Sequence, residues 1–357
     1  MKAIKCFGPK NAKVIPDAPV PEAPADYLLV KVIAVALNPT DWKHIDFIAQ
    51  PDYNHTVGCD YAGIVVSVGS AVTKSFRPGD RIAGFSHGSK HEDPSSGCFA
   101  EYAKVKGDIQ LKIPENISFE EAASWPTGIN TTGQGMYGPD GLGLPEPEQQ
   151  QQQQSATAEK VPILIYGGST NTGLWAIQYA KLSGLRVITT CSEKNFEAVK
   201  ALGADEVFDY RDEKCGEKIR EVTKNGLKFA FDCVSEGNSM EICAKALSSD
   251  GSGAQYNALL PVEFPRKDVK TSFTIGYSVN GEDFTFFGNY QPAKPQDFDF
   301  GKRWGALAEK LLTSGSIKAP ATTIRKGGLQ GVLEGLEDMK NGRISRQKLV
   351  YRIADSC

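Results

Sequence analysis

The sequence predicts a two-domain α/β protein, with a β-rich domain followed by a doubly wound parallel sheet. The chain has 357 residues, which is more than one hydrophobic core usually organises. Up to about residue 117, short apolar runs are broken by Gly, Pro and Asp, as in a domain of short strands. Beyond Pro126, strand-like and helix-like apolar patterns alternate, which is typical of a parallel sheet.

The first domain shows strands separated by tight turns. Leu28–Val35 and Gly63–Gly69 are apolar runs that predict strands, and Pro78–Gly84 combines a turn signal with the start of another strand. This pattern favours a partly open barrel with tight corners.

The second domain begins with a buried strand at Val161–Tyr166 and a helix over Leu174–Leu182. The further elements are a strand at Arg186–Thr190, a helix at Phe196–Leu202, and strands near Glu206–Phe208 and Phe229–Asp232. Before this domain, the polar stretch 145–159 contains six consecutive glutamines. Its low apolar content predicts a mobile surface insertion without chemistry.

Composition excludes several function classes. The 40 basic and 43 acidic residues are interspersed and give a net charge of -3, so no basic face for nucleic acid is expected. The N-terminus lacks the apolar core of a secretory signal, and no run of about 18 apolar residues predicts a membrane span. The eight cysteines are scattered, which predicts reduced, mostly structural thiols. We therefore expect a cytoplasmic enzyme that acts on a small or tethered molecule.

The strongest local motif is the glycine-rich segment Tyr166–Gly173, which follows a predicted strand and opens a predicted helix. Small residues let backbone N–H groups approach a pyrophosphate, and the helix N-terminus attracts its negative charge. Thr170 replaces the middle glycine of the usual pattern, and the alternative is an ordinary glycine-rich turn. The surrounding strand-loop-helix order favours a dinucleotide site.

The end of the second predicted strand bears on the choice of nicotinamide cofactor. Enzymes that bind NAD usually place an acidic residue there, whereas this chain has Cys191. Ser192 could donate to a 2′-phosphate and Lys194 could neutralise it, which favours NADPH. Glu193 argues in the other direction, and Ser192 could equally be a helix N-cap.

Several motifs together resemble the medium-chain dehydrogenase/reductase superfamily over essentially the whole chain. They are Asn38–Lys43, Val57–Gly63, Pro78–Arg81, the glycine-rich segment and Asp205–Tyr210. Within that superfamily the chain is most similar to the trans-acting enoyl reductases that serve fungal highly reducing polyketide synthases. The loop Gly167–Thr172 and the segments Cys191–Asn195 and Gln347–Val350 carry this finer match.

The resemblance implies a GroES-like partly open barrel and a Rossmann-type domain. The barrel would comprise residues 1–125, completed by 290–357, and the Rossmann-type domain residues 126–289, with the active site in the interdomain cleft. Zinc members carry Gly-His-Glu where this chain has Gly58-Cys59-Asp60, and a cysteine where Thr40 stands. The four cysteines of the structural zinc lobe are also missing, so the resemblance implies a zinc-free enzyme and disfavours alcohol oxidation.

The activity implied by the resemblance is NADPH-dependent reduction of an α,β-unsaturated thioester, by hydride addition to the β-carbon. A polyketide synthase would present the substrate on a carrier, and the reductase would be a monomer. The alternatives are a zinc-free quinone oxidoreductase or alkenal reductase, and, in another class, a catalytically silent NADPH-binding protein.

Site residues are carried over by position. Lys43 is the catalytic candidate, because an ammonium near the nicotinamide can polarise a carbonyl, although it could equally contact only NADPH or solvent. The expected cofactor contacts are Thr40, Asp41, Trp42, Lys43, Ser169, Thr170, Asn171, Thr172, Ser192, Glu193, Lys194, Asn195, Tyr210, Leu259, Leu260, Leu349 and Val350. The expected substrate contacts, which could equally be loop packing, are Thr132, Gly133, Gln134, Gly135, Met136, Tyr137, Gly138, Pro139, Thr274, Ile275, Gly276, Tyr277 and Ser278.

Two further features have a structural interpretation. His87 and His91 are four residues apart and precede Glu92-Asp93. The segment around them contains Gly, Ser and Pro, so we expect an exposed, non-helical loop rather than a metal site. Asp41 is expected to be an orienting hydrogen-bond acceptor rather than a general acid.

Overall fold

The structure, a computed structural model, describes residues 1–147, 160–344 and 347–355. It forms two compact units, Met1–Asn130 with Tyr277–Cys357 and Thr131–Gly276, each described here by itself. The predicted Gln-rich insertion, 145–159, falls mostly on residues 148–159, which lie outside the described residues. Cys357 at the C-terminus lies outside them as well. The domain boundaries expected from the sequence stay a prediction.

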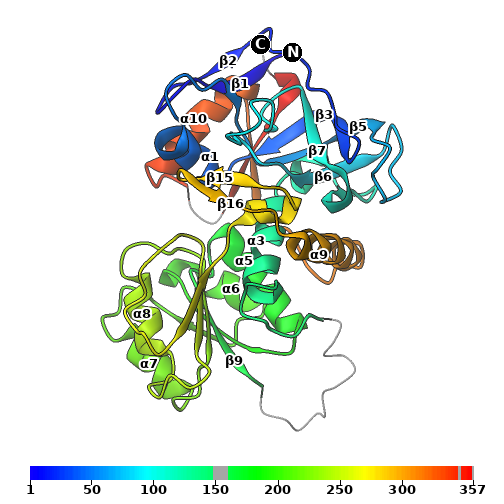
Figure 1. Cartoon of the computed structure of the whole chain (residues 1–357). Helices are drawn as coiled ribbons and strands as arrows, with labels where there is room; N and C mark the ends of the chain where they lie inside the picture. The colour runs from blue at the N-terminus through cyan, green and yellow to red at the C-terminus, as the bar shows by residue number, and fades with distance from the viewer. Residues whose placement is uncertain (148–159, 345–346, 356–357) are drawn as a thin grey trace. The chain divides into compact units, whose positions relative to one another are not determined.

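The first unit, which we call the barrel unit, is built on a seven-stranded sheet. Its order is β17-β18-β3-β5-β6-β8, with β7 also paired to β3. These strands are β3 (Tyr27–Ala36), β5 (Asp60–Val68), β6 (Arg81–Phe85), β7 (Tyr102–Lys106), β8 (Leu111–Lys112), β17 (Thr322–Arg325) and β18 (Lys348–Arg352). The C-terminal β18 pairs antiparallel with β3, so a strand from the end of the chain joins strands from its first third in one sheet (Figure 1).

Smaller elements complete the barrel unit. A three-stranded sheet contains β1 (Ala3–Cys6), β2 (Ala12–Ile15) and β4 (His55–Thr56), and a hairpin contains β15 (Phe284–Phe286) and β16 (Asn289–Gln291). The helices are α1 (Pro39–Lys43), the π-helix η1 (His44–Ile48), η2 (Gly107–Ile109), α2 (Phe119–Ala122), η4 (Gly276–Asn280), α9 (Pro295–Thr313), α10 (Gly328–Lys340) and η5 (Ile353–Asp355). Alternate residues of β3, such as Leu28, Val30 and Val32, lie in the core, because successive side chains of a strand point to opposite faces.

The second unit, which we call the sheet unit, contains a six-stranded parallel sheet in the order β11-β10-β9-β12-β13-β14. Its strands are β9 (Pro162–Tyr166), β10 (Arg186–Thr190), β11 (Glu206–Phe208), β12 (Phe229–Asp232), β13 (Gln255–Ala258) and β14 (Lys270–Phe273). Numbered from β9, this is the strand order 3-2-1-4-5-6 of the Rossmann fold. The predicted strands and helices of this region are therefore confirmed.

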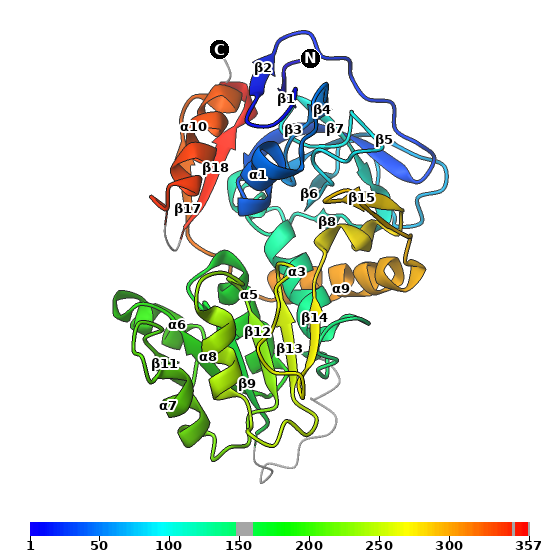
Figure 2. The same cartoon turned by 60° about the vertical axis from the view of Figure 1, so that its left-hand side comes forward.

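Helices cover both faces of this sheet. They are α5 (Asn171–Leu182), η3 (Glu193–Asn195), α6 (Phe196–Ala201), α7 (Cys215–Val222) and α8 (Ser239–Ala246). In Figures 1 and 2, α7 and α8 lie on one side of the sheet, and α5 lies on the other. The helix α3 (Pro126–Tyr137) contains the boundary between the two units.

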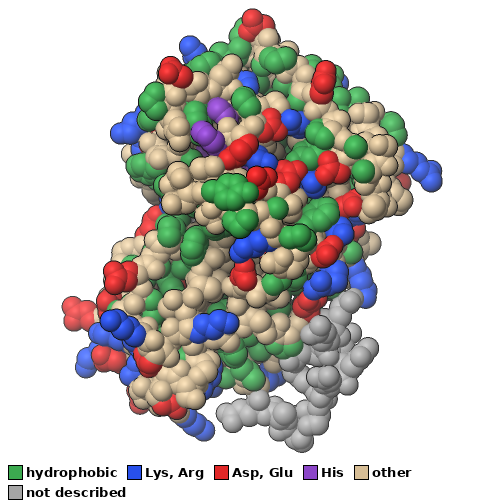
Figure 3. Space-filling view, in the orientation of Figure 1, with side chains coloured by type: hydrophobic (Ala, Val, Ile, Leu, Met, Phe, Trp, Pro, Cys, Tyr) green, Lys and Arg blue, Asp and Glu red, His purple; other side chains and the backbone are tan. Residues whose placement is uncertain are grey.

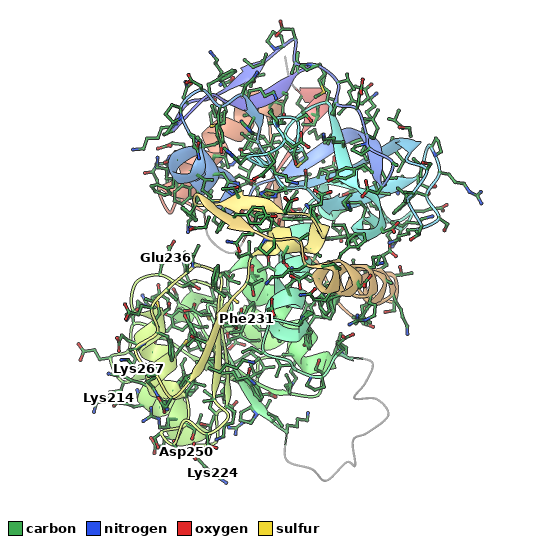
Figure 4. All side chains as sticks on the ribbon, in the orientation of Figure 1. Lys214, Lys224, Phe231, Glu236, Asp250 and Lys267 are labelled. Atoms are coloured by element: carbon green, nitrogen blue, oxygen red, sulfur yellow. The ribbon has the colours of Figure 1, made fainter. Side chains whose placement is uncertain are left out.

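Parallel strands place all their carboxyl ends at one edge of the sheet. Figure 4 shows Glu236, which follows β12, at one end of the sheet unit, and Lys224 and Asp250, which precede β12 and β13, at the other. Ligands of open parallel sheets bind outside the carboxyl ends, where the strand order reverses, here between β9 and β12. The glycine-rich segment follows β9 and so lies at this edge.

Candidate functional site

The glycine-rich segment forms a tight turn between β9 and α5. Gly167 adopts a left-handed conformation with φ +81°, and its N–H donates to Thr190 Oγ1 at 3.0 Å. Thr170, which replaces the expected glycine, is the N-cap of α5, and its hydroxyl accepts from the Gly173 N–H at 3.0 Å. The departure from the motif therefore supplies a helix cap at the N-terminus where a phosphate would bind.

Two glycines of this turn are required by close packing. A Cβ on Gly173 would lie 2.3 Å from the Gly167 carbonyl oxygen, and a Cβ on Gly168 would lie 2.1 Å from Thr189 Oγ1. Real Cβ atoms do not approach backbone oxygens this closely, so any larger residue at 173 must displace the turn. The structure thus gives a physical reason for glycine at both positions.

The ends of β10 and β11 carry mixed charge. Cys191 is buried, and burial raises the pKa of its thiol to about 11. Ser192 is the N-cap of η3, without a side-chain cap hydrogen bond, and Lys194 is exposed. After β11, the Arg211 guanidinium donates to Asp209 and lowers the pKa of that carboxyl to about 2.

Arg211 was not among the residues predicted from the sequence. Arg211 is an exposed cation whose charge interacts with Glu193 and Tyr210, both expected cofactor contacts. No motif marked Arg211, but its place in the loop after β11, close to a predicted cofactor residue, was a usable signal. Lys194 and Arg211 bring two cations to this corner of the sheet edge, beside the carboxylates of Glu193 and Asp209.

The loops after β12 and β13 are tied together by Asp232. Its Oδ1 accepts from the N–H groups of Val234 and Ser235 at 2.9 and 2.8 Å, and its Oδ2 accepts from the Tyr256 hydroxyl at 2.8 Å. The Ser235 hydroxyl then accepts from the Leu259 N–H at 2.8 Å. Leu259 is thereby held at the carboxyl edge, in the region where the sequence predicted cofactor contacts.

The predicted substrate segment 132–139 contributes most of its described side chains to packing within the sheet unit. It belongs to α3 up to Tyr137, whose hydroxyl lies 3.0 Å from Ser183 Oγ. Met136 is fully buried, and a Cβ on Gly135 would meet the ring of Phe231, which is labelled in Figure 4. In the second predicted segment, Thr274 donates to Asn257 Oδ1 at 2.9 Å, so its hydroxyl is also engaged internally.

In the barrel unit, α1 carries Thr40 to Lys43. The Asn38 N–H donates to Asp41 Oδ2 at 2.7 Å, which fixes the start of this short helix. Burial raises the pKa of Asp41 to about 7, with a further rise from the Asp60 carboxylate, while the Asn38 N–H and Lys348 lower it. Asp41 thus accepts a hydrogen bond within its own helix. Its expected role as an orienting acceptor rather than a general acid stays a prediction. Lys43 Nζ lies 5.6 Å from the centre of the Trp42 ring.

A buried polar network lies behind α1. Lys348 Nζ contacts Asp60 Oδ2 at 2.9 Å, with both side chains almost completely buried, and it also donates to Asn38 Oδ1. Asn38 Nδ2 donates to the same Asp60 oxygen at 2.9 Å, and Thr127 donates to Asp60 Oδ1 from its N–H and hydroxyl at 2.8 and 2.6 Å. Lys348 and Thr127 were not among the predicted site residues, because residues so far apart carry no shared motif.

A second buried cluster surrounds Tyr277. Its hydroxyl lies 2.7 Å from Thr40 Oγ1, 3.7 Å from Cys59 Sγ and 3.4 Å from His44 Nδ1. Its ring stacks on His87, with centroids 3.7 Å apart and planes within 10°. The cluster brings together Thr40 and Tyr277, which were predicted to contact different molecules.

The expectation of an exposed loop at His87 is wrong. Ser86, His87 and Ser89 are all buried, because the aromatic stack with Tyr277 and the edge of Phe284 enclose the loop. The segment is non-helical, as expected. Burial lowers the pKa of His87 well below its usual value, so the ring is neutral.

The residues of this cluster do not fit a zinc ion. Cys59 and Thr40 stand where zinc members place ligands, but a threonine hydroxyl is not a usual zinc ligand and the Tyr277 hydroxyl lies close to both side chains. Within residues 1–147, 160–344 and 347–355, no group of three or more His, Cys, Asp or Glu side chains is arranged to hold a metal ion. Seven cysteines, Cys6 to Cys243, are free and buried.

Two further predicted cofactor residues, Leu349 and Val350, lie fully buried in β18. The Leu349 carbonyl accepts from the Leu37 N–H at 3.0 Å, so this backbone is part of the sheet beside α1. On the face shown in Figure 3, basic and acidic side chains are interspersed rather than gathered by sign. Over the described part of the chain, no helix has the length and apolarity of a membrane span.

Two protein families match the chain. Residues 24–115 match the family described as alcohol dehydrogenase GroES-like domain, and residues 172–281 match the family described as zinc-binding dehydrogenase. The trans-enoyl reductase ACTTS2 of Alternaria alternata is 45% identical over 340 residues, which is 95% of each chain. The trans-enoyl reductase resD of Aspergillus sclerotiorum is 43% identical over 360 residues, covering 99% of this chain and 100% of the relative.

Solved structures agree on the fold. An alcohol dehydrogenase superfamily protein from Novosphingobium aromaticivorans has a TM-score of 0.76 at 22% identity, covering 98% of this chain and 99% of that one. The CurK enoyl reductase has a TM-score of 0.74 at 16% identity, covering 98% of each chain. A mycobacterial protein complexed with NADPH has a TM-score of 0.72 at 19% identity, covering 99% of each chain. These likenesses confirm the expected GroES-like and Rossmann-type architecture.

Proposed function

The chain belongs to the trans-enoyl reductases of the medium-chain dehydrogenase/reductase superfamily, and on that premise we propose that it reduces the α,β-unsaturated thioester of a polyketide intermediate with NADPH. The observation that carries the proposal is the 45% identity to a trans-enoyl reductase over 95% of both chains. The substrate would be presented on the carrier of a polyketide synthase, which is the sense of a reductase acting in trans.

The sheet unit supports a nicotinamide cofactor. The turn after β9 presents the N-terminus of α5 at the carboxyl edge, and the glycine packing at 168 and 173 lets backbone approach a pyrophosphate closely. Ser192, Lys194 and Arg211 would hold a 2′-phosphate, since the strand end offers cations and Cys191 in place of the usual acid. When bound, NADPH would supply the hydride that adds to the β-carbon of the substrate.

The barrel unit supports stabilisation of negative charge on the substrate. Hydride addition to the β-carbon moves the π electrons onto the thioester oxygen, so donors aimed at that oxygen accelerate the reaction. Lys43, on α1 next to Thr40, is the proposed catalytic residue, with its ammonium directed to the developing enolate. The remaining proton reaches the α-carbon from solvent.

Two alternatives remain distinct in their chemistry. A quinone oxidoreductase or alkenal reductase of the same fold would prefer a small diffusible acceptor to a thioester. A silent NADPH-binding protein would hold the cofactor without turnover. The identity to trans-enoyl reductases favours the thioester substrate over both.

The test is oxidation of NADPH by the full chain in the presence of crotonyl N-acetylcysteamine thioester, followed by absorbance. Saturable turnover is the expected result, with Lys43→Ala lowering kcat by about 10- to 100-fold. Lys31→Ala, at an exposed lysine of β3, is the matched control and should keep wild-type kcat. Turnover of a quinone but not of the thioester, or NADPH binding without turnover of either, contradicts the proposal.

A further inference from the structure

Three side chains, those of Thr40, His44 and Cys59, converge on the hydroxyl of Tyr277, which lies in η4. Thr40 comes from the first turn of α1, His44 begins η1, and Cys59 precedes β5. The Thr40 contact is the shortest, at 2.7 Å, whereas the Cys59 and His44 contacts are 3.7 and 3.4 Å. Thr40 is half-buried, and the other three side chains are buried, so Thr40 is the member of the cluster with access to solvent.

The Tyr277 ring is held firmly. It stacks on His87 at 3.7 Å and on His44 at 5.2 Å, with Phe85 a further stacked neighbour at 5.5 Å. The segment that follows is anchored by Glu282, which accepts from the Tyr27 hydroxyl at 2.5 Å and from Lys90 at 2.7 Å. A ring packed on several sides keeps its hydroxyl at a fixed position.

Every member of the cluster is neutral. Burial raises the pKa of the Cys59 thiol and of the Tyr277 hydroxyl well above their usual values, so both keep their protons. Burial also lowers the pKa of His44 to about 4 and lowers the pKa of His87 well below its usual value, so neither ring is charged near neutral pH. The cluster therefore offers polarised hydroxyl groups and no ion.

We propose that Tyr277 is a positioning residue for the reduction: its hydroxyl donates to Thr40 Oγ1, which directs the Thr40 proton toward the thioester oxygen of the substrate and the enolate oxygen formed from it. Thr40 is then the catalytic donor, and Tyr277 acts through it. This inference rests on the proposed function and adds to it an uncharged donor for the oxygen that Lys43 also faces.

Either hydroxyl of the Thr40–Tyr277 contact can be the donor, and the proposal assigns that role to Tyr277. The Cys59 thiol and the Tyr277 hydroxyl each have one proton, and the shortest contact of Tyr277 is to Thr40. When Tyr277 gives its proton to that contact, the Thr40 hydroxyl keeps its own proton for a partner outside the cluster. Consecutive hydroxyl bonds polarise one another, which strengthens the terminal donor.

No covalent change occurs in the cluster. The substrate gains a hydride at the β-carbon, its π pair becomes the enolate, and a proton from water reaches the α-carbon. Thr40 and Tyr277 keep their protons throughout, and only their hydrogen bonds strengthen as charge develops on the substrate oxygen.

The experiment is a double-mutant cycle on kcat for crotonyl N-acetylcysteamine thioester. Thr40→Val, which removes the hydroxyl, should lower kcat about 100-fold, and Tyr277→Phe, which keeps the ring stack, about tenfold. The double variant should match Thr40→Val alone, because Tyr277 acts only through Thr40. Thr40→Ser, which keeps the hydroxyl, should retain most of kcat.

Two controls separate this role from stability and cofactor binding. Tyr61→Phe removes another buried tyrosine hydroxyl of the barrel unit, whose partner is Gln110 at 2.9 Å, and should leave kcat unchanged. Tyr277→Phe should keep the wild-type affinity for NADPH, measured by fluorescence titration. Thermal unfolding of all variants reports folding directly.

Three outcomes overturn the inference. A Tyr277→Phe variant with wild-type kcat contradicts it, and so does a double variant whose loss is the product of the two single losses. A Thr40→Val variant with wild-type kcat contradicts it even where the tyrosine variant does not fold. Wild-type protein that turns over no thioester instead refutes the proposed function, on which the inference depends.

Discussion

The two candidate regions are built by different means. At the carboxyl edge of the parallel sheet, the turn Gly167–Gly173 is one continuous segment, held by backbone packing and a single cap at Thr170. In the barrel unit, side chains at positions 40, 59 and 277, and at 38, 60 and 348, are brought together from across the chain. The glycine-rich turn depends on the absence of side-chain atoms. The clusters of the barrel unit depend on buried polar side-chain atoms.

This difference has an energetic meaning. A glycine turn is disturbed by added atoms, because a Cβ meets backbone that cannot move cheaply. A buried polar network is disturbed by removed atoms, because each loss leaves a desolvated partner without compensation.

Lys348→Met should be the most damaging change. It leaves Asp60 buried with its ammonium partner removed, which costs about 3 to 5 kcal/mol of unfolding free energy. Lys200→Met, at an exposed pair with Glu197, is the control and should cost less than about 0.5 kcal/mol. Denaturant unfolding measures the free energy of unfolding of both variants. Equal losses would show that the buried Lys348–Asp60 pair stabilises the fold no more than the exposed pair does.

Asp41→Asn should change the pH dependence of stability. The folded chain keeps the Asp41 proton up to a pH of about 7, whereas the ordinary pKa of an aspartate side chain is 3.8. Between these values the folded state binds more protons, so ionisation of Asp41 makes the wild type less stable as pH rises, by at most about 1.4 kcal/mol per pH unit. The Asp41→Asn variant has no carboxyl at this position and therefore lacks this loss of stability.

Denaturant unfolding between pH 4 and pH 7 tests whether the free energy of unfolding falls as pH rises. Asp60, Lys348 and Cys59 face the Asp41 carboxyl and stay unchanged in this variant. Asp17→Asn, at an exposed position, is the matched control. If the free energy of unfolding changes with pH equally in Asp41→Asn and wild type, the pKa of Asp41 is not raised in the folded state.

Gly173→Ala should destabilise the turn by about 1 to 3 kcal/mol, although alanine is the better helix former. The added Cβ would lie 2.3 Å from the Gly167 carbonyl oxygen. At the exposed Gly226, a Cβ meets nothing closer than 3.0 Å, so Gly226→Ala is the control. Thermal unfolding together with NADPH titration gives the answer, and a stabilised Gly173→Ala protein would disprove the close packing.

Lys194→Ala should have the smallest effect, a rise of about tenfold in the dissociation constant of NADPH with little change for NADH. The reason is loss of the cation proposed to face the 2′-phosphate. Lys200→Ala, on α6, keeps the same net charge as the variant and serves as the control. An equal rise in the dissociation constants of NADPH and NADH would contradict the proposal that Lys194 faces the 2′-phosphate.

Local patterns in the sequence were enough to predict strands and helices in both units and the turn that follows β9. Strand and helix periodicity and a contiguous glycine motif are local signals, so Tyr166–Gly173 and the strands around it could be read directly. The resemblance of short motifs also led to the family that the relatives confirm.

The contacts between buried polar side chains, in contrast, could be seen only in the tertiary structure. His87 was expected on an exposed loop, yet it stacks on Tyr277, and Lys348 pairs with Asp60 almost three hundred positions away in the chain. Burial of a histidine or a lysine depends on what covers it, and the covering residues come from strands and loops far apart in sequence. Local patterns contain no record of such contacts, because sheet pairing and side-chain packing join residues that no spacing relates.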